Sequence, residues 1–131
     1  MCTSSAKTDV VGRLHGPEHA PIIVVAGGIS SGRFAARWWP SVVKAGGPVD
    51  LNHFRVLGFD LLPGREAQGV TITTTDQARL LAVLLDALGE PRIDVFVGAS
   101  YGGCIGLAFA AAFPDRIGEL AVISAAHRAH P

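Results

Sequence analysis

The chain has 131 residues, which is enough for one globular domain with a buried core. Hydrophobic residues make up 49% of it and charged residues 17%, and this balance excludes a disordered chain. The formal net charge is zero and the longest apolar runs are only strand-length, so we expect neither nucleic acid nor a membrane as partner. The partners we expect are a small-molecule substrate and other polypeptides.

The N-terminal residues and the two cysteines indicate a cytoplasmic protein without a metal site. Residues 1–7 have no apolar run behind their charge, so they do not resemble a signal peptide. Cys2 and Cys104 belong to no Cys-x-x-Cys or paired-histidine pattern of the kind that holds zinc. We therefore expect cytoplasmic localisation, no metal and no tightly bound cofactor.

The first half of the chain alternates strand and helix patterns. A short strand is predicted over residues 10–14. Residues 21–26 are apolar throughout, which is typical of a central parallel strand buried on both faces, and two glycines end it. Residues 34–44 place two tryptophans and two valines on one side and predict a helix, which glycines and a proline stop. Residues 54–60 predict the next strand.

The second half repeats the alternation. A helix begins at Thr75 or Asp76 and runs through Leu88, since its leucines recur at helical spacing. A strand over 95–97 leads into a helix over 102–113, and residues 119–124 predict a last strand. Strands joined through helices imply an α/β fold with a doubly wound, mostly parallel sheet. Ligands of such sheets bind beyond the carboxyl ends of the strands.

The most informative motif lies at one of those strand ends. Gly98-Ala99-Ser100-Tyr101-Gly102 follows an apolar strand and precedes a helix-forming run, as a Gly-x-Ser-x-Gly nucleophile elbow requires. A sharp turn from strand to helix strains the central residue and crowds its neighbours, and glycine relieves that crowding because it has no Cβ. We therefore predict that Ser100 is a catalytic nucleophile, held out at the tip of the turn.

Two backbone amides are candidates for the oxyanion hole. The N–H of Tyr101 directly follows the nucleophile, and the second donor should come from the loop after an earlier central strand. That loop offers Gly27, Gly28 or Ile29, and Gly28 is our assignment. Asp60 also lies at a strand end, but it precedes the serine, and we interpret it as an acceptor that orders its own loop.

The acid and the base of the expected triad are not evident. A Gly-x-Ser-x-Gly hydrolase has its acid and then its histidine after the serine, yet only about 30 residues follow Ser100. His127 and His130 are downstream, but they follow the strand beside the serine strand, whereas the base of this topology comes from further along. We expect the catalytic aspartate and histidine to come from polypeptide outside this chain.

Several segments together resemble one branch of the α/β-hydrolases. Residues 97–103, 107–110, 113–116 and 122–131 are similar to the homoserine O-acyltransferases. The serine turn and the Pro-Asp-Arg segment are common to many α/β-hydrolases, whereas the ending Ser-Ala-Ala-His-Arg-Ala-His-Pro is specific to that branch. The resemblance implies methionine biosynthesis and a ping-pong reaction, in which Ser100 takes an acetyl or succinyl group from acyl-CoA as co-substrate and passes it to homoserine.

The resemblance covers only the front part of such an enzyme. It implies that residues 1–131 are the N-terminal part of a single α/β-hydrolase domain, truncated after the sixth strand of that fold. The family's lid, aspartate and histidine would follow, supplied by a second polypeptide or by a missing C-terminal part, and a homodimer is possible. Residues 58–64 are shorter than the corresponding family loop, which leaves the acyl donor and the acceptor open.

Three alternatives remain to be compared. A serine esterase of the same fold would use the same turn. An inactive fragment could act only as a structural half of a complemented enzyme, because the strand at 119–124 would otherwise present an apolar open edge. Nucleotide binding is disfavoured: the glycine turn at 25–32 has Phe34 where another glycine is required, and residues 98–103 contain no lysine for a Walker loop.

Overall fold

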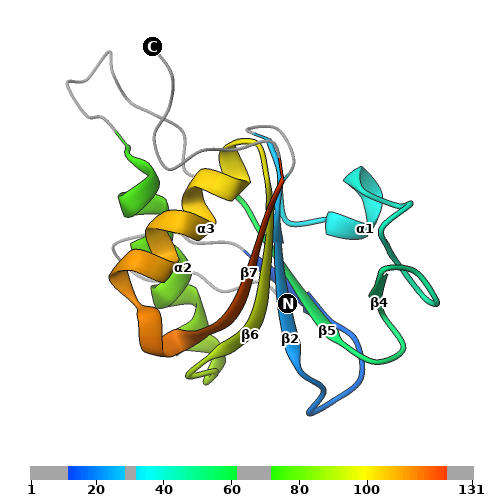
Figure 1. Cartoon of the computed structure of the whole chain (residues 1–131). Coiled ribbons are helices and arrows are strands. Elements are labelled where there is room, and N and C mark those ends of the chain that lie inside the picture. Colours follow the sequence, from blue (N-terminus) through cyan, green and yellow to red (C-terminus); the bar gives the residue numbers. More distant parts are fainter. Residues whose placement is uncertain (1–11, 29–31, 62–71, 124–131) are drawn as a thin grey trace.

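The computed structural model describes residues 12–28, 32–61 and 72–123 (Figure 1). At its centre is a five-stranded sheet with the strand order β1-β5-β2-β6-β7. Its strands are β1 Gly12–His15, β2 Ile22–Ala26, β5 Arg55–Phe59, β6 Ile93–Ala99 and β7 Ile117–Ile123. β1 pairs antiparallel with β5, and every other neighbouring pair is parallel. The expected α/β fold with a mostly parallel sheet is confirmed.

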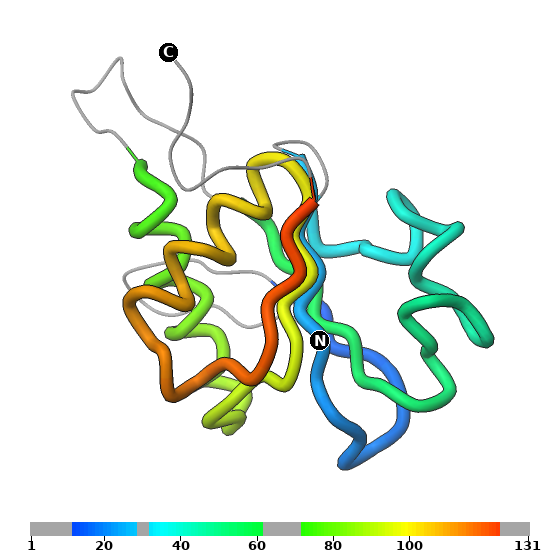
Figure 2. The backbone as a smooth tube through the Cα atoms, in the orientation of Figure 1, coloured from blue at the N-terminus to red at the C-terminus, as the bar shows by residue number. Residues whose placement is uncertain are grey.

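Helices cover the sheet on both faces. The remaining elements are α1 Ala35–Trp38, β3 Val43–Lys44, β4 Val49–Asp50, α2 Thr74–Leu88, α3 Tyr101–Ala112 and a 3₁₀ turn at Pro114–Arg116. α2 and α3 lie together against one face, whereas α1 and the small β3–β4 sheet lie on the other (Figures 1 and 2). The β2-α1-β5 connection therefore covers one face, and the next two connections cover the other, as in a doubly wound sheet.

The core divides into two apolar clusters on either side of β2. All five residues of β2 are buried, as predicted for a central strand with both faces covered. Val24 and Phe96 pack with Phe109 of α3 in the cluster beneath the two long helices. Val25 belongs to the cluster on the other face, together with Val43 beside the small β3–β4 sheet. The central strand thereby fixes both layers relative to the carboxyl edge of the sheet.

Helix α2 has well-defined signals at both ends. The Thr73 hydroxyl accepts a hydrogen bond from the Asp76 N–H, and the Asp76 carboxylate accepts one from the Thr73 N–H at 2.9 Å. The hydrogen bond from the Thr73 N–H, and then the interaction with the Thr73 side chain, hold the pKa of Asp76 below its usual value. Gly89 ends the helix in the left-handed conformation with φ 74°. The helix starts slightly earlier than the sequence predicted, because Thr73 rather than a later residue is the cap.

The predicted helix over residues 34–44 is wrong in its second half. Only Ala35–Trp38 is helical, and Val43–Lys44 forms strand β3, which pairs parallel with β4. Pro40 explains the early end, since a proline disfavours helical backbone at the residue before it, and Trp39 has φ −132° and ψ 55°. The two tryptophans still pack on the same cluster, with their rings stacked 5.4 Å apart between centroids.

Other boundaries shift by a few residues. β1 starts at Gly12, and residues 10 and 11 of the predicted first strand lie outside the described part of the chain. β7 begins two residues earlier than predicted, and Ser124 also lies outside the described residues. Among the helices that the structure describes, none combines the length and hydropathy that a bilayer crossing needs.

Candidate active site

Ser100 lies between the end of β6 and the start of α3 with an unusual backbone conformation. Its φ is 55° and its ψ is −123°, a combination that residues with a side chain rarely adopt. The residue is exposed, and its side chain makes no capping hydrogen bond to α3. The turn therefore presents the Ser100 hydroxyl at the carboxyl edge of the sheet, where the motif predicts it.

The two glycines of the motif occupy positions that no side chain could share. A Cβ at Gly98 would lie 2.5 Å from the carbonyl oxygen of Gly102, and a Cβ at Gly102 would lie 2.2 Å from that of Ala26. Both contacts are with backbone, which cannot swing aside. Glycine is therefore required for α3 to start this close to β2 and β6.

Backbone hydrogen bonds connect the turn to the ends of both neighbouring strands. The Ser100 N–H donates to the carbonyl oxygen of Ile123 in β7 at 2.9 Å, and the Gly102 N–H donates to that of Gly27 after β2 at 2.9 Å. The loop that begins at Gly27 is thus held against the first turn of α3. This contact brings the serine and the proposed oxyanion loop to one place on the sheet edge.

The two predicted oxyanion donors lie on either side of this contact. Tyr101 is the first residue of α3, and its N–H belongs to the initial amides that a helix leaves without an intrahelical acceptor. Gly28 directly follows the Gly27 carbonyl that α3 binds, and a Cβ there would meet no atom of the described residues within 4 Å. Ile29, the third alternative for the loop donor, lies outside the described residues.

Asp60 binds an arginine that the sequence analysis did not connect with it. Its carboxylate accepts from the Arg33 N–H at 2.8 Å and forms an ion pair with the Arg33 guanidinium. Residues 62–71, which belong to the loop that Asp60 was expected to order, lie outside the described residues. Because 27 positions separate Arg33 and Asp60, no local pattern could have revealed the pair. The pair holds the segment around Arg33, which follows the Gly28 loop, against the end of β5.

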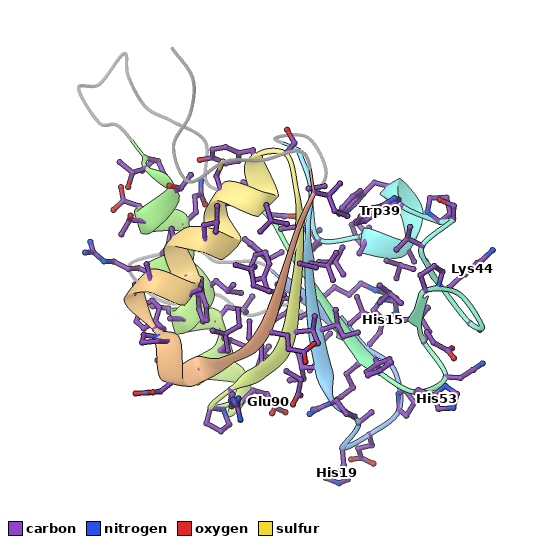
Figure 3. All side chains as sticks on the ribbon, in the orientation of Figure 1. His15, His19, Trp39, Lys44, His53 and Glu90 are labelled. Atoms are coloured by element: carbon purple, nitrogen blue, oxygen red, sulfur yellow. The ribbon has the colours of Figure 1, made fainter. Side chains whose placement is uncertain are left out.

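The three described histidines lie away from Ser100. His15 ends β1 and pairs with Val56 near the start of β5, whereas His19 and His53 are in loops at the opposite end of the parallel strands (Figure 3). His127 and His130, the two downstream candidates, lie outside the described residues. In the described ranges, no group of three His, Cys, Asp or Glu side chains is placed to hold a metal ion.

Comparisons with known proteins identify the fold family. A family model described as the alpha/beta hydrolase fold matches residues 20–131. The chain is 44% identical over 126 residues to a homoserine O-succinyltransferase of Xanthomonas campestris pv. campestris, in an alignment that covers 90% of this chain and 34% of the relative. The chain thus spans about a third of the length of that enzyme. The resemblance to homoserine O-acyltransferases is confirmed as a similarity.

Solved structures give the same architecture. Homoserine O-acetyltransferase from Staphylococcus aureus superposes with a TM-score of 0.79 at 18% identity, covering 92% of this chain and 41% of that one. The enol-lactonase from Burkholderia xenovorans LB400 superposes with a TM-score of 0.75 at 28% identity, covering 98% of this chain and 48% of that one. The family model covers most of the chain, and the chain belongs to the α/β-hydrolase fold family.

Proposed function

We propose that Ser100 is the nucleophile of an acyltransferase that moves an acetyl or succinyl group from acyl-CoA to the hydroxyl of homoserine. The observation that carries the proposal is the strained, exposed Ser100 at the strand-to-helix turn, whose glycine neighbours leave no room for a side chain. Similarity to homoserine O-acyltransferases supports the acyl chemistry and the acceptor. Structural strain at a functional residue is the usual cost of holding a nucleophile in position.

The proposed reaction has two acyl-transfer steps. The Ser100 oxygen attacks the thioester carbonyl while a base takes its proton. The tetrahedral oxyanion collapses to an acyl-serine as the C–S bond breaks, and the base passes the proton to the departing CoA sulfur. The homoserine hydroxyl then attacks the acyl-serine and gives its proton to the same base. The bond between the acyl group and the Ser100 oxygen breaks, the base returns the proton to that oxygen, and O-acylhomoserine leaves. In both steps the amides of Gly28 and Tyr101 would donate to the oxyanion.

The base and its carboxylate partner would come from polypeptide outside this chain. The chain spans about a third of the length of the curated relatives it matches, and no described histidine lies at the carboxyl edge with Ser100. Without a base, Ser100 has no group to accept its proton at neutral pH. We therefore propose a complemented or longer enzyme as the active form, with the front part of the site in this chain.

A serine hydrolase is the second candidate function. The same turn and oxyanion loop would support it, and the similarity in fold to an enol-lactonase favours it. The two functions differ only in the second step, where water or homoserine attacks the acyl-serine. Product analysis with both acceptors present separates them.

The 131-residue chain alone should show essentially no turnover with acyl-CoA or activated esters. An oxyanion hole without a working triad accelerates acyl transfer only about 10³- to 10⁴-fold over water. A chimera in which this chain replaces the matched third of the Xanthomonas enzyme should transfer an acyl group to homoserine. Thiol release and mass spectrometry of the ester, with acetyl-CoA and succinyl-CoA in parallel, identify the donor.

The chimera also distinguishes the alternatives. Ser100→Ala should abolish its activity, whereas Ser41→Ala, an exposed serine in the loop after α1, should leave it unchanged. Ester cleavage without O-acylhomoserine would favour the hydrolase. Robust Ser100-dependent turnover by the 131-residue chain alone would overturn the assignment of the base to another polypeptide.

A surface beside the site supports the proposed partner. Among the described strands β7 pairs only with β6, so its other edge is open, and Ile123 is 46% exposed there. Ala121 and Ile123 point to the face opposite α3, next to the half-buried Val97 of β6. We propose that polypeptide corresponding to the other two-thirds of the curated relatives covers this edge and face.

Without that partner the chain should self-associate. Sedimentation velocity of the 131-residue chain is expected to show oligomers or aggregates, because an apolar, unpaired strand edge pairs with other chains. Ile123→Lys should reduce this association, since a lysine on an edge strand opposes pairing. Val83→Lys, which changes the similarly exposed Val83 on α2, is the control and should not reduce it. A stable monomer with a cooperative melt would contradict the prediction.

A further inference from the structure

Three arginines converge on one aromatic ring at the opposite edge of the sheet from β7. The guanidinium carbon lies 4.7 Å from the ring centroid of Phe34 for Arg37, 4.8 Å for Arg33 and 5.7 Å for Arg13. Arg13 comes from β1, Arg33 directly precedes Phe34 in the chain, and Arg37 lies within α1. Two segments well separated in the sequence thus build one cationic cluster.

A glycine in β5 allows the three arginines to converge on Phe34. Arg13 pairs with Gly58 across the β1–β5 ladder, and a Cβ at Gly58 would lie 2.4 Å from the carbonyl oxygen of Arg33. Glycine therefore lets the backbone before α1 lie directly on the sheet. Leu14 packs into the core beneath α2, so Arg13 and His15, one residue to either side of it, face the α1 layer.

The cluster carries more positive charge than the described residues neutralise. Arg33 is paired with Asp60, but within the described ranges neither Arg13 nor Arg37 forms an ion pair with a carboxylate. Two guanidinium groups are thus in excess beside one ring. Stacking on an aromatic ring attracts each guanidinium but does not remove their mutual repulsion. An anion bound between the guanidinium groups would offset that repulsion.

The space for such an anion is present. A pocket of about 150 Å³ is lined by Arg13, His15, Phe34, Ala36 and Arg37. Burial, and then the charge of Arg13, lower the pKa of His15, so its imidazole is neutral at pH 7 and can donate one hydrogen bond. The pocket therefore combines two charged guanidinium forks with one neutral polar group on an apolar floor.

We propose that this pocket binds a phosphate group of a small-molecule ligand. Guanidinium groups match tetrahedral oxyanions through paired N–H donors, and a phosphate dianion balances the two unpaired arginines, whereas a single carboxylate would balance one. The site lies at the β1 side of the sheet, whereas Ser100 lies between β2 and β7, so the proposal does not depend on the role of the serine.

Equilibrium dialysis of the 131-residue chain against radiolabelled inorganic phosphate, at constant ionic strength, tests the proposal. Dialysis counts bound ions per chain whatever the state of association. We expect saturable binding of one phosphate per chain, weakened about tenfold or more by Arg37→Gln and by Arg13→Gln, since each removes a hydrogen bond to a charged group. Arg79→Gln, an exposed arginine on α2 in the other layer, should leave binding unchanged.

Each other outcome counts against the proposal. Binding that is not saturable, or that falls equally in Arg37→Gln and Arg79→Gln, would show only nonspecific attraction to surface charge. Acetate that competes as well as phosphate would assign the pocket to carboxylates instead. Arg37 is exposed, so loss of folding should not accompany its substitution, and a circular dichroism spectrum of each variant checks this.

Discussion

Gly102→Ala is expected to lower the free energy of unfolding by about 3 kcal/mol or more, the upper range for overpacking a close-packed interior. The new Cβ would lie 2.2 Å from the carbonyl oxygen of Ala26 and 2.3 Å from its carbonyl carbon. Both atoms belong to β2, which is buried throughout, so the strand cannot retreat without disturbing both core clusters. Urea denaturation followed by tryptophan fluorescence, at one fixed protein concentration, measures the loss.

Gly28→Ala is the matched control. Gly28 lies in the loop that contacts the start of α3, yet a Cβ there would meet no atom of the described part of the chain within 4 Å, and its φ is not positive. We expect its free energy of unfolding to stay within about 0.5 kcal/mol of the parent chain. Equal destabilisation by the two substitutions would show that the close approach of α3 to β2 does not depend on glycine.

The parts of the fold that sequence predicted are those in which local pattern and burial agree. β2 is apolar at every position and lies at the centre of the sheet, and α2 has leucines at helical spacing between a Thr73 cap and Gly89. The prediction for residues 34–44 was wrong because their apolar residues fit one side of a long helix as well as they fit the observed short helix and strand. There the backbone restriction that Pro40 imposes on Trp39 outweighed the helical spacing of the apolar residues. Val43 lies in the two-residue strand β3 instead.

The candidate active site and the arginine cluster differ in the same way. Ser100 and its two glycines lie within five consecutive residues, so the strand-turn-helix pattern was sufficient to locate them. The arginine cluster on Phe34 is non-local: Arg13 reaches it only because β1 runs antiparallel to β5 and pairs Arg13 with Gly58. A motif reveals neither the register of an edge strand nor the space above a glycine in which another segment of backbone can lie.

Ser100→Gly should abolish acyl transfer in the chimera while stabilising the fold. Glycine adopts φ 55° and ψ −123° without the steric cost of about 1 to 3 kcal/mol that a side chain incurs in a sparsely populated region. Its greater freedom in the unfolded chain offsets about 0.5 to 1 kcal/mol of that gain. The expected net increase in the free energy of unfolding is about 1 kcal/mol.

Ser100→Ala separates the two effects. Alanine also lacks the hydroxyl, so both variants should lose at least about 10⁴-fold in kcat, as expected when a nucleophile is removed. Alanine keeps its Cβ and therefore the strain, so only the glycine variant should unfold at higher urea than the parent. Equal stability of the two variants would mean that the turn is not strained. Retained activity in either would remove Ser100 from the reaction, because neither variant carries the serine hydroxyl.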